Sequence, residues 1–218
     1  MSSARRTALL ARAREIDAVV LEDDYDGEFL YDAHRQDALQ TLDRDGRVFY
    51  VSTFSKSLFP ALRKGFVVVP EWAREAMIDI KRSTDSHTDV VPQAALAAFI
   101  ADGHLARHIR RMRLVYSQRR RTLEQGAQDH WANFMEMLPG NAGLHMSARI
   151  VDPAMSQAIL KCASRHLPGA LPLSAYTMGT AKQHGLCIGY GGVEVDQIAS
   201  AVRGLGGAMR TLRRRGSI

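Results

Sequence analysis

Lys56 stands in the stretch of this sequence best suited to chemistry. Two hydroxyl-bearing residues, Thr53 and Ser55, come just before it, and Arg63 follows seven residues later. A lysine amine can act as a nucleophile toward a carbonyl group. An arginine binds phosphate through a fixed fork of donors, and hydroxyl groups can complete such a site. The segment therefore combines an amine nucleophile with a phosphate site.

A second chemical segment lies about thirty residues upstream, at 22–29, and it contains Asp23 and Tyr25. It directly follows the apolar run 18–21, which predicts a buried strand. The lysine segment follows another predicted strand, at 48–51, in the same way. Open α/β sheets bind ligands at the carboxyl ends of their strands. The sequence therefore predicts a ligand site that has a carboxylate and a phenol as well as the amine.

Pyridoxal phosphate is a cofactor that makes these demands together. It needs a lysine for a Schiff base, a carboxylate beside the pyridine nitrogen, a donor near the phenolic oxygen, and cations and hydroxyls for the phosphate. Lys56 can form the Schiff base, Asp23 can pair with the pyridine nitrogen, and Tyr25 can donate near the phenolic oxygen. The phosphate can be bound by Thr53, Ser55 and Arg63.

Simpler interpretations exist for both segments. The acidic segment fits a calcium loop at some positions, but position 12 would be Ala33, where a bidentate glutamate is required. It could also be a solvated turn. Lys56 could be an ordinary surface lysine or half of a Ser-Lys dyad, although its neighbours do not resemble a hydrolase elbow. The missing glycines before it exclude a Walker loop. His104 and His108 are spaced like metal ligands without an evident third ligand, so no metal site is predicted.

The pattern of apolar residues predicts an α/β chain of two domains. Strands are predicted at 18–21, 48–51, 65–69 and 186–190, with an alternating segment at 143–151. Helices are predicted at 3–14, 71–82, 92–101, 153–166 and 193–214, with a long helix from 104 to about 130. We expect a large domain at 1–130, which includes this connecting helix, and a small α+β domain at 131–218.

Composition and charge narrow the class of protein. The 218 residues are 46% hydrophobic and carry a net charge of +6, with arginines concentrated at 104–121 and 210–215. In the first of these segments, apolar residues recur at helical spacing, so its arginines are expected on the solvated side of an amphipathic helix. The sequence has no motif typical of nucleic-acid binding and no run long enough for a membrane span. Two cysteines, Cys162 and Cys187, favour a reducing cytoplasm.

The segments 21–32 and 53–63 closely resemble the aminotransferase-like domain of MocR-type regulators, a branch of the GntR superfamily. This domain is similar to the fold-type I, class I/II aminotransferases. The resemblance implies part of their large domain, with a mixed, mostly parallel sheet, followed by a small α+β domain. It implies the same roles for Lys56, Asp23, Tyr25 and Arg63 as the chemistry does, with Thr53 and Ser55 at phosphate-contacting positions.

The resemblance also implies a function: an effector domain that binds pyridoxal phosphate and responds to an amine or amino acid, as a homodimer. In such regulators DNA is bound by a winged-helix domain, for which this sequence shows no match. The chain resembles the C-terminal two-thirds or so of the aminotransferase-like domain, so we expect weak cofactor binding and little transaminase activity. Many aminotransferases place an arginine for the substrate carboxylate in the C-terminal strand, which here reads Leu186-Cys187-Ile188-Gly189-Tyr190. A stand-alone aminotransferase and an inactive truncated fragment are the alternatives.

Overall fold

The computed structural model describes residues 1–31, 37–140, 142–178 and 183–215. The chain forms two compact units, residues 1–109 and 110–218, and each is described by itself. The division falls inside the long helix α5 (His104–Trp131). The sequence predicted domains at 1–130 and 131–218, which assign the part of α5 after residue 109 to the first domain instead of the second. These domain bounds stay a prediction.

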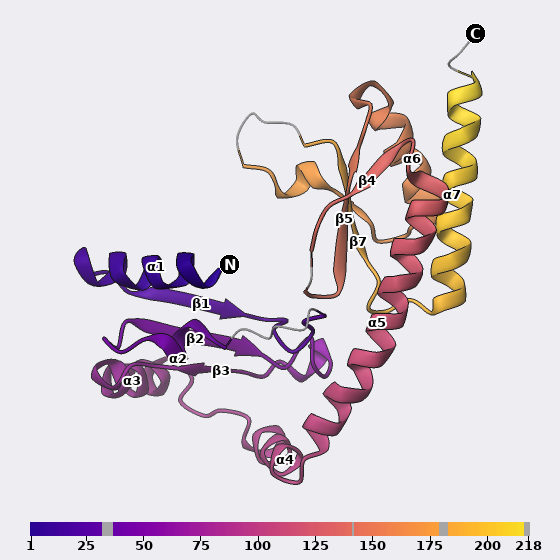
Figure 1. The fold of residues 1–218 in the computed structure, drawn as a ribbon. Helices are drawn as coiled ribbons and strands as arrows, with labels where there is room; N and C mark the ends of the chain where they lie inside the picture. The colour runs from indigo at the N-terminus through magenta and orange to yellow at the C-terminus, as the bar shows by residue number, and fades with distance from the viewer. Residues whose placement is uncertain (32–36, 141, 179–182, 216–218) are drawn as a thin grey trace. The chain divides into compact units, whose positions relative to one another are not determined.

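Unit 1 is built around a three-stranded sheet in the order β1-β2-β3 (Figure 1). Its strands are β1 (Val20–Asp24), β2 (Val48–Thr53) and β3 (Gly65–Val68). Its helices are α1 (Ser3–Glu15), α2 (Leu39–Leu42), α3 (Arg74–Thr84) and α4 (Val90–Ala101), with 3-10 turns at Pro60–Leu62 and Glu71–Ala73. The β1 and β2 strands pair in parallel, whereas β2 and β3 pair antiparallel. The sheet is therefore mixed, as expected.

The register of this sheet places the predicted site residues. Asp23 lies opposite Val51 in the parallel pair, and Thr53 lies opposite Gly65 in the antiparallel pair. Because side chains alternate between the two faces of a strand, Asp23, Val51 and Thr53 share one face of the sheet. The opposite face carries Glu22 and Asp24.

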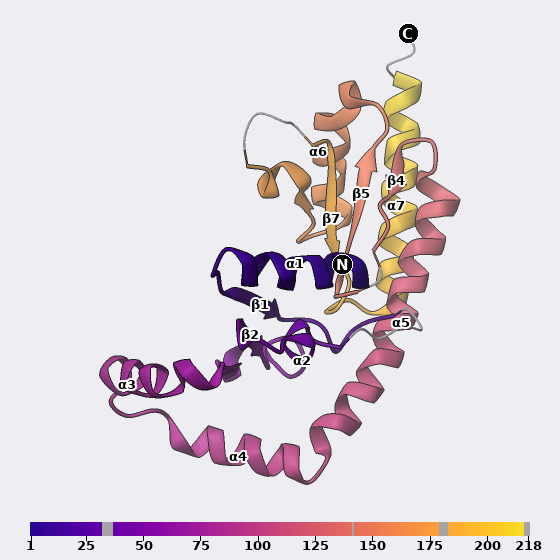
Figure 2. The same ribbon diagram turned by 60° about the vertical axis from the view of Figure 1, so that its left-hand side comes forward.

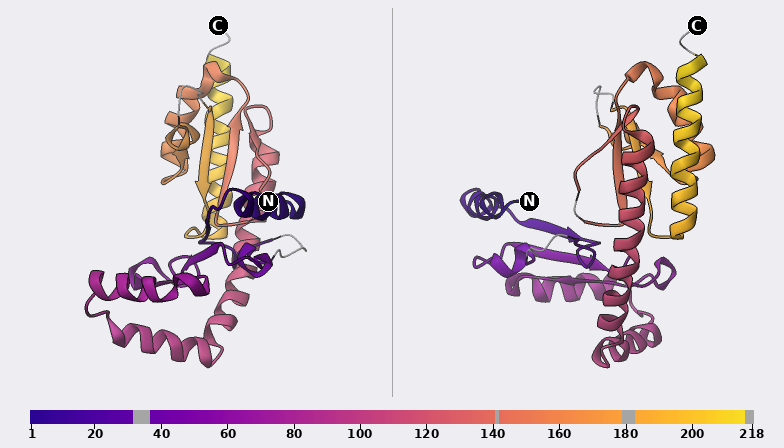
Figure 3. Two further views of the ribbon diagram at one scale, coloured as in Figure 1. Left: turned by 90° about the vertical axis from the view of Figure 1, so that its left-hand side faces the viewer. Right: turned by 45° about the vertical axis from the view of Figure 1, so that its right-hand side comes forward.

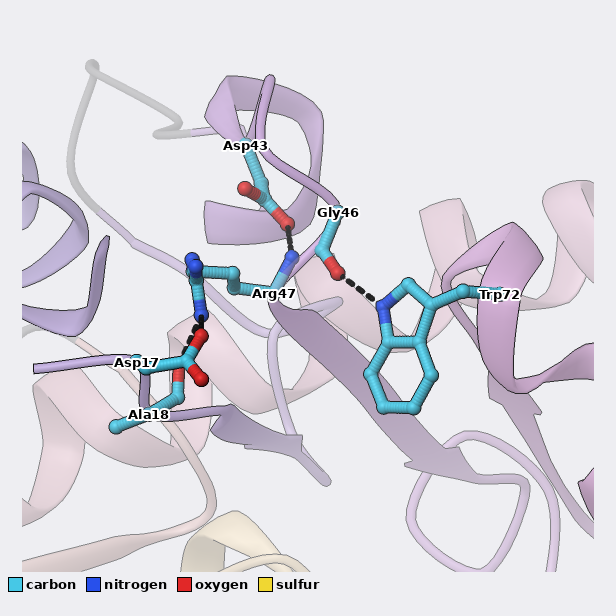
Figure 4. Close-up of polar contacts among 6 residues, drawn as sticks. All are labelled: Asp17, Ala18, Asp43, Gly46, Arg47 and Trp72. Carbon is cyan, nitrogen blue, oxygen red and sulfur yellow. Dashed lines mark hydrogen bonds and ion pairs between the residues drawn. The ribbon is translucent and has the colours of Figure 1, made fainter.

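Polar contacts fix the point where β2 begins (Figure 4). The guanidinium of Arg47 donates to Oδ1 of Asp17 at 2.9 Å, which ties the start of β2 to the turn before β1. The backbone N–H of Arg47 donates to Oδ2 of Asp43 at 2.5 Å. The indole of Trp72 donates to the carbonyl oxygen of Gly46 at 2.7 Å. These bonds join three loops, so they set the level at which β2 starts beside β1.

Unit 2 contains an antiparallel sheet in the order β4-β5-β7-β6. Figure 2 labels its strands β4, β5 and β7. Its strands are β4 (Met135–Met137), β5 (His145–Ile150), β6 (Leu171–Pro172) and β7 (Gly185–Gly189). Its helices are the remainder of α5, α6 (Ser156–His166) and α7 (Val195–Arg215), with 3-10 turns at Pro153–Met155 and Leu173–Tyr176. Helices α5 and α7 run side by side (Figure 3).

The core of unit 2 joins these two helices to the sheet. Trp131, at the end of α5, is fully buried and its indole N–H donates to the carbonyl oxygen of Val202 in α7 at 2.9 Å. Tyr190 is also buried, and its hydroxyl donates to the carbonyl oxygen of Gly143 at 2.6 Å. Arg119 in α5 donates to the carbonyl oxygen of Gly191. The Trp131 bond therefore joins α5 to α7 directly, and the Arg119 bond joins α5 to the segment that precedes α7.

The predicted elements are largely confirmed, with shifts at their ends. The first strand is observed at Val20–Asp24 instead of 18–21, so Asp23 lies within the strand and not after it. The helix predicted at 71–82 begins with a 3-10 turn and continues to Thr84. The sequence did not predict α2, β4 or β6. In the parts of the chain that the structure describes, no helix is long and apolar enough to cross a membrane.

Candidate functional site

Three consecutive carboxylates in β1 have three different environments. Both oxygens of Glu22 accept hydrogen bonds from backbone N–H groups at the start of α2, from Leu39 at 2.6 Å and from Gln40 at 2.9 Å. Oδ2 of Asp24 accepts a hydrogen bond from the Tyr50 hydroxyl at 2.7 Å. Asp23 points to the other face, is exposed, and makes no hydrogen bond or ion pair to the described residues. Of the three, Asp23 is the carboxylate left for a ligand.

The lysine loop, residues 54–64, joins β2 to β3 and is closed by backbone contacts. The N–H of Phe54 donates to the carbonyl oxygen of Lys64 at 3.1 Å. The Thr53 hydroxyl lies 3.3 Å from the same oxygen and 2.9 Å from the Ser55 hydroxyl. The Ser55 N–H also donates to the Thr53 hydroxyl at 3.1 Å. The structure therefore brings together the two hydroxyls predicted for the phosphate.

Lys56 lies within the first turn of this loop. The N–H of Leu58 donates to the carbonyl oxygen of Phe54 at 2.8 Å, which bends the backbone around the lysine. The Lys56 side chain is half-buried, and its amine has no hydrogen bond or ion pair to the residues described. Next to it, Ser57 is 1% exposed, and its buried hydroxyl has no hydrogen-bond partner among those residues. The Lys56 amine and the Ser57 hydroxyl thus make no hydrogen bond or ion pair with the residues described.

Arg63 stands at the far end of the loop. It follows the 3-10 turn Pro60–Leu62 and adopts a left-handed conformation with φ of 49°, while its N–H donates to the carbonyl oxygen of Pro60 at 3.2 Å. This conformation is uncommon outside glycine. Arg63 lines an open cleft of about 1050 Å³ together with Phe54 and Lys64. Of the predicted site residues only Arg63 lines this cleft.

The remaining predicted residue, Tyr25, follows β1 and is 47% exposed. The structure thus joins Thr53 to Ser55 and puts Asp23 on the same sheet face as Thr53. It shows no hydrogen bond or ion pair of Lys56 or Arg63 with the other predicted residues among those it describes. A ligand that reached all of these groups would have to span the ends of β1 and β2 and the lysine loop.

Tyr50 is a polar residue of this region that the sequence reasoning missed. Burial, and secondarily the hydrogen bond to Asp24, raises the pKa of Tyr50 to about 12. Its position in the apolar run 48–51 indicated a strand and gave no sign of a partner. The only available signal was that Tyr50 and Asp24 both lie near the ends of neighbouring predicted strands. Ser57 was also missed, since its burial depends on how the loop folds.

The unpaired groups of this region fit pyridoxal phosphate. A free amine, a free carboxylate and a free guanidinium belong to Lys56, Asp23 and Arg63, and two hydroxyls sit between them in the chain. These groups lie at or just after strand ends of an α/β sheet, where such sheets bind ligands. Among the residues described, no group of three or more His, Cys, Asp or Glu side chains could hold a metal ion.

Comparison with known proteins gives the class of protein. The family model described as aminotransferase class I and II matches residues 2–164. The chain therefore belongs to the aminotransferase class I and II family. The match and the solved structures of the family support pyridoxal phosphate as its cofactor.

The chain can also be compared with individual relatives. The chain is 36% identical over 209 residues to an uncharacterized HTH-type transcriptional regulator, YhdI, of Bacillus subtilis. It is 32% identical over 213 residues to the probable rhizopine catabolism regulatory protein MocR of Rhizobium meliloti. These alignments cover 94% and 98% of the chain but only 44% and 43% of the relatives. The resemblance to the aminotransferase-like domain of MocR-type regulators is therefore confirmed, and the chain spans less than half the length of these relatives.

The fold is confirmed by solved structures. A kynurenine aminotransferase of Pyrococcus horikoshii, solved in complex with PMP, superposes with a TM-score of 0.86 at 27% identity. A multiple substrate aminotransferase of Thermococcus profundus also gives 0.86, at 25% identity. These alignments cover 97% and 99% of this chain and 52% and 53% of the solved chains.

Proposed function

We propose that this chain is the pyridoxal-phosphate-binding, aminotransferase-like effector part of a MocR-type transcriptional regulator. The observation that carries the proposal is the set of unpaired charged side chains, Asp23, Lys56 and Arg63, at the strand ends of unit 1. Relatives that match most of the chain include HTH-type transcriptional regulators, which favours a regulatory use of this site.

Each side chain has a role that follows from its chemistry. Pyridoxal phosphate, when bound, supplies an electron sink for a substrate amine. The Lys56 amine would hold the cofactor covalently, and Asp23 would keep a proton on the pyridine nitrogen. Arg63, with the hydroxyls of Thr53 and Ser55, would bind the phosphate. Tyr25 would donate to the phenolic oxygen.

The strand where many aminotransferases place an arginine for the substrate carboxylate favours the regulator over the enzyme. Strand β7 contains no arginine, and its one polar side chain, Cys187, is half-buried opposite Ser147 of β5. A thiol is a weak donor and has no positive charge at neutral pH, so it cannot take the place of an arginine as a partner for a substrate carboxylate. The proposed ligand is therefore an amine or amino acid effector held mainly through the cofactor.

The second candidate is a stand-alone aminotransferase acting on an amino acid. It is favoured by the similarity to solved aminotransferases over nearly the whole chain. In that function Lys56, once free of the cofactor, would also move the α-proton of the substrate. The remaining parts of the proposal are a cytoplasmic location, a homodimer, and DNA binding by a winged-helix domain outside this sequence. An inactive fragment is the third alternative.

A reduction experiment tests the site. The purified chain is titrated with pyridoxal phosphate, treated with borohydride, digested and mapped by mass spectrometry. We expect the label on the peptide with Lys56, its loss in Lys56→Ala, and an unchanged label in Lys161→Ala, which removes an exposed lysine of α6. A label on another lysine would disprove the assignment. Steady turnover of an amino donor with a keto acid would favour the enzyme.

A further inference from the structure

The positive charge of this chain is concentrated in unit 2. Residues 110–218 contain 15 Lys and Arg against 6 Asp and Glu, a net charge of +9. Residues 1–109 contain 14 against 17, a net charge of −3. A strong asymmetry of charge between two parts of one chain indicates a polyanionic partner for the basic part. The cofactor site proposed above lies in unit 1 and does not account for this charge.

The structure separates the arginines of unit 2 into two groups. Arg119 donates to Glu194 at 2.6 Å, and Arg120 donates to Glu124 at 2.8 Å, so these arginines hold the fold together. Three exposed arginines of α7 form no ion pair or hydrogen bond with the described residues, and they are Arg203, Arg210 and Arg214. The second group is therefore available to a partner.

These free arginines lie along one side of α7. Their separations, seven residues and then four, match two turns and one turn of a helix. They extend over about 16 Å at 1.5 Å per residue. The sequence of α7 contains no Asp or Glu after Asp196, so no carboxylate on this helix neutralises them.

Two adjoining grooves between α5 and α7 extend this basic side. One, of about 450 Å³, is lined by Arg121 and Arg203 with Gln118 and Gln125. The other, of about 550 Å³, is lined by Asn133 and by the arginines at 210, 213 and 214. Both grooves include His130 and the single acidic residue Asp129. Amide and guanidinium groups are donors that contact phosphate oxygens in complexes with DNA.

The helices that carry these groups are held rigidly. A Cβ atom on Gly206 of α7 would lie 2.7 Å from Cβ of His130 in α5, so the two backbones approach closely there. Opposite the arginines, Val202, Leu205 and Met209 are fully buried. Because the apolar side of α7 is already in the core, it is not free to insert into a lipid surface. A nucleic acid therefore fits this face better than a membrane.

We propose that the basic face of unit 2, formed by Arg121, Arg203, Arg210 and Arg214, binds the phosphate backbone of duplex DNA. Relatives that cover most of the chain include HTH-type transcriptional regulators, which makes DNA the polyanion best matched to this surface. Over about 16 Å a duplex presents about ten phosphate charges. The contact is independent of base sequence, and it is separate from any DNA-binding domain elsewhere in the regulator.

Fluorescence anisotropy with a labelled 30-base-pair duplex of arbitrary sequence tests this proposal. The full 218-residue chain is titrated at several salt concentrations from 50 to 300 mM. The test variant carries Arg203→Gln, Arg210→Gln and Arg214→Gln. Each cation that contacts a phosphate contributes about 0.9 to the slope of log affinity against log salt, so this variant should lose about 2.7 from the slope.

Two matched variants complete the experiment. Arg110→Gln, Arg111→Gln and Arg165→Gln remove the same charge from exposed positions elsewhere in unit 2 that likewise form no ion pair or hydrogen bond with the described residues, and they should leave the slope nearly unchanged. Lysine at positions 203, 210 and 214 keeps the charge and should restore the slope. The proposal is overturned if the two glutamine variants behave alike, or if the unmodified chain does not bind the duplex at 50 mM salt. Binding to vesicles containing phosphatidylserine, without binding to the duplex, would also overturn it.

Discussion

The hydroxyl of Tyr50 donates a hydrogen bond of 2.7 Å to Asp24 across the parallel pair β1–β2. The main-chain oxygen of Asp24 also accepts a hydrogen bond from the Ser52 hydroxyl at 2.7 Å. Two side chains of β2 therefore hold the end of β1, at the level where Asp23 lies on the opposite face. The position of Asp23, the carboxylate proposed to contact the cofactor, therefore depends on contacts made on the other side of the sheet.

Replacing Tyr50 with phenylalanine should destabilise the chain in a pH-dependent way. At pH 8 we expect a loss of about 1 kcal/mol in the free energy of unfolding, as for one partly exposed hydrogen bond. Burial, with the Asp24 hydrogen bond second, raises the pKa of Tyr50 from 10.0 to about 12. The contribution of the Tyr50 hydroxyl to the free energy of unfolding is therefore complete below pH 10 and is lost as the pH rises through 12.

Urea unfolding of both proteins from pH 8 to pH 12 measures this difference. The gap between wild type and Tyr50→Phe should narrow above pH 10. Asp24→Asn serves as the comparison, because it removes the negative charge that opposes ionisation of the phenol. A gap that stays constant up to pH 12 would show that Tyr50 is not held in its protonated form by the fold.

Asp23 and Arg63 should have separable effects on the cofactor. Asp23→Asn should change the absorption spectrum of bound pyridoxal phosphate more than its affinity, because the carboxylate acts on the protonation of the pyridine nitrogen. Arg63→Ala should weaken binding by about tenfold to a hundredfold, as expected for losing one hydrogen-bonded charge at roughly 1.5–3 kcal/mol. Arg74→Ala, at an exposed position of α3, is the control. Unchanged affinity in Arg63→Ala would refute this division of roles.

Adjacent glycines in α7 should respond to alanine in opposite directions. A Cβ on Gly206 would lie 2.7 Å from Cβ and 2.9 Å from the carbonyl oxygen of His130, so Gly206→Ala should cost about 1–3 kcal/mol by overpacking. At Gly207 the nearest atom would be a terminal nitrogen of Arg210 at 3.9 Å. There alanine should stabilise the helix by up to about 1 kcal/mol. Thermal unfolding of the two variants checks this, and a shift of both midpoints in the same direction would contradict it.

Arg119 should contribute more to stability than its carboxylate partner. Its side chain is 9% exposed and it donates to the carbonyl oxygen of Gly191 as well as to Glu194, whose side chain is 70% exposed. Arg119→Met should cost about 1–3 kcal/mol, because the partly buried carbonyl of Gly191 loses its donor. Glu194→Gln should cost less than about 1 kcal/mol, since the exposed carboxylate contributes as a surface ion pair does. Equal losses in denaturant unfolding would show that the ion pair, not the backbone contact, carries the effect.

Local patterns predicted most of this fold. The apolar runs that precede Asp23 and Lys56 predicted β1 and β2, and helical spacing predicted α5 and the final helix. Strands β4 and β6 were missed because three and two residues are too few for a pattern to be recognised. The arginines of α5 were expected in solvent, which is wrong for Arg119. It lies three residues after the buried Tyr116 and so shares its face.

The sequence predicted which residues could form the candidate site, but it did not predict the contacts that position them. Lys56, Asp23 and Arg63 were chosen by residue type and by resemblance, and their roles stay a prediction. The bonds from Glu22 to the start of α2 join residues 17 and 18 positions apart, and no local pattern indicates them. The burial of Ser57 likewise depends on how the loop closes.

The alternation in β1 has a consequence for how substitutions in this strand would be tolerated. Glu22 and Asp24 are used by the fold, whereas Asp23 between them is not. In a saturation-mutagenesis library, most changes at 22 and 24 should lower the yield of folded protein. Most changes at 23 should leave the yield intact and remove only the response to the cofactor. A lineage that lost its ligand would therefore be free to change Asp23 first, while the carboxylates on either side remained.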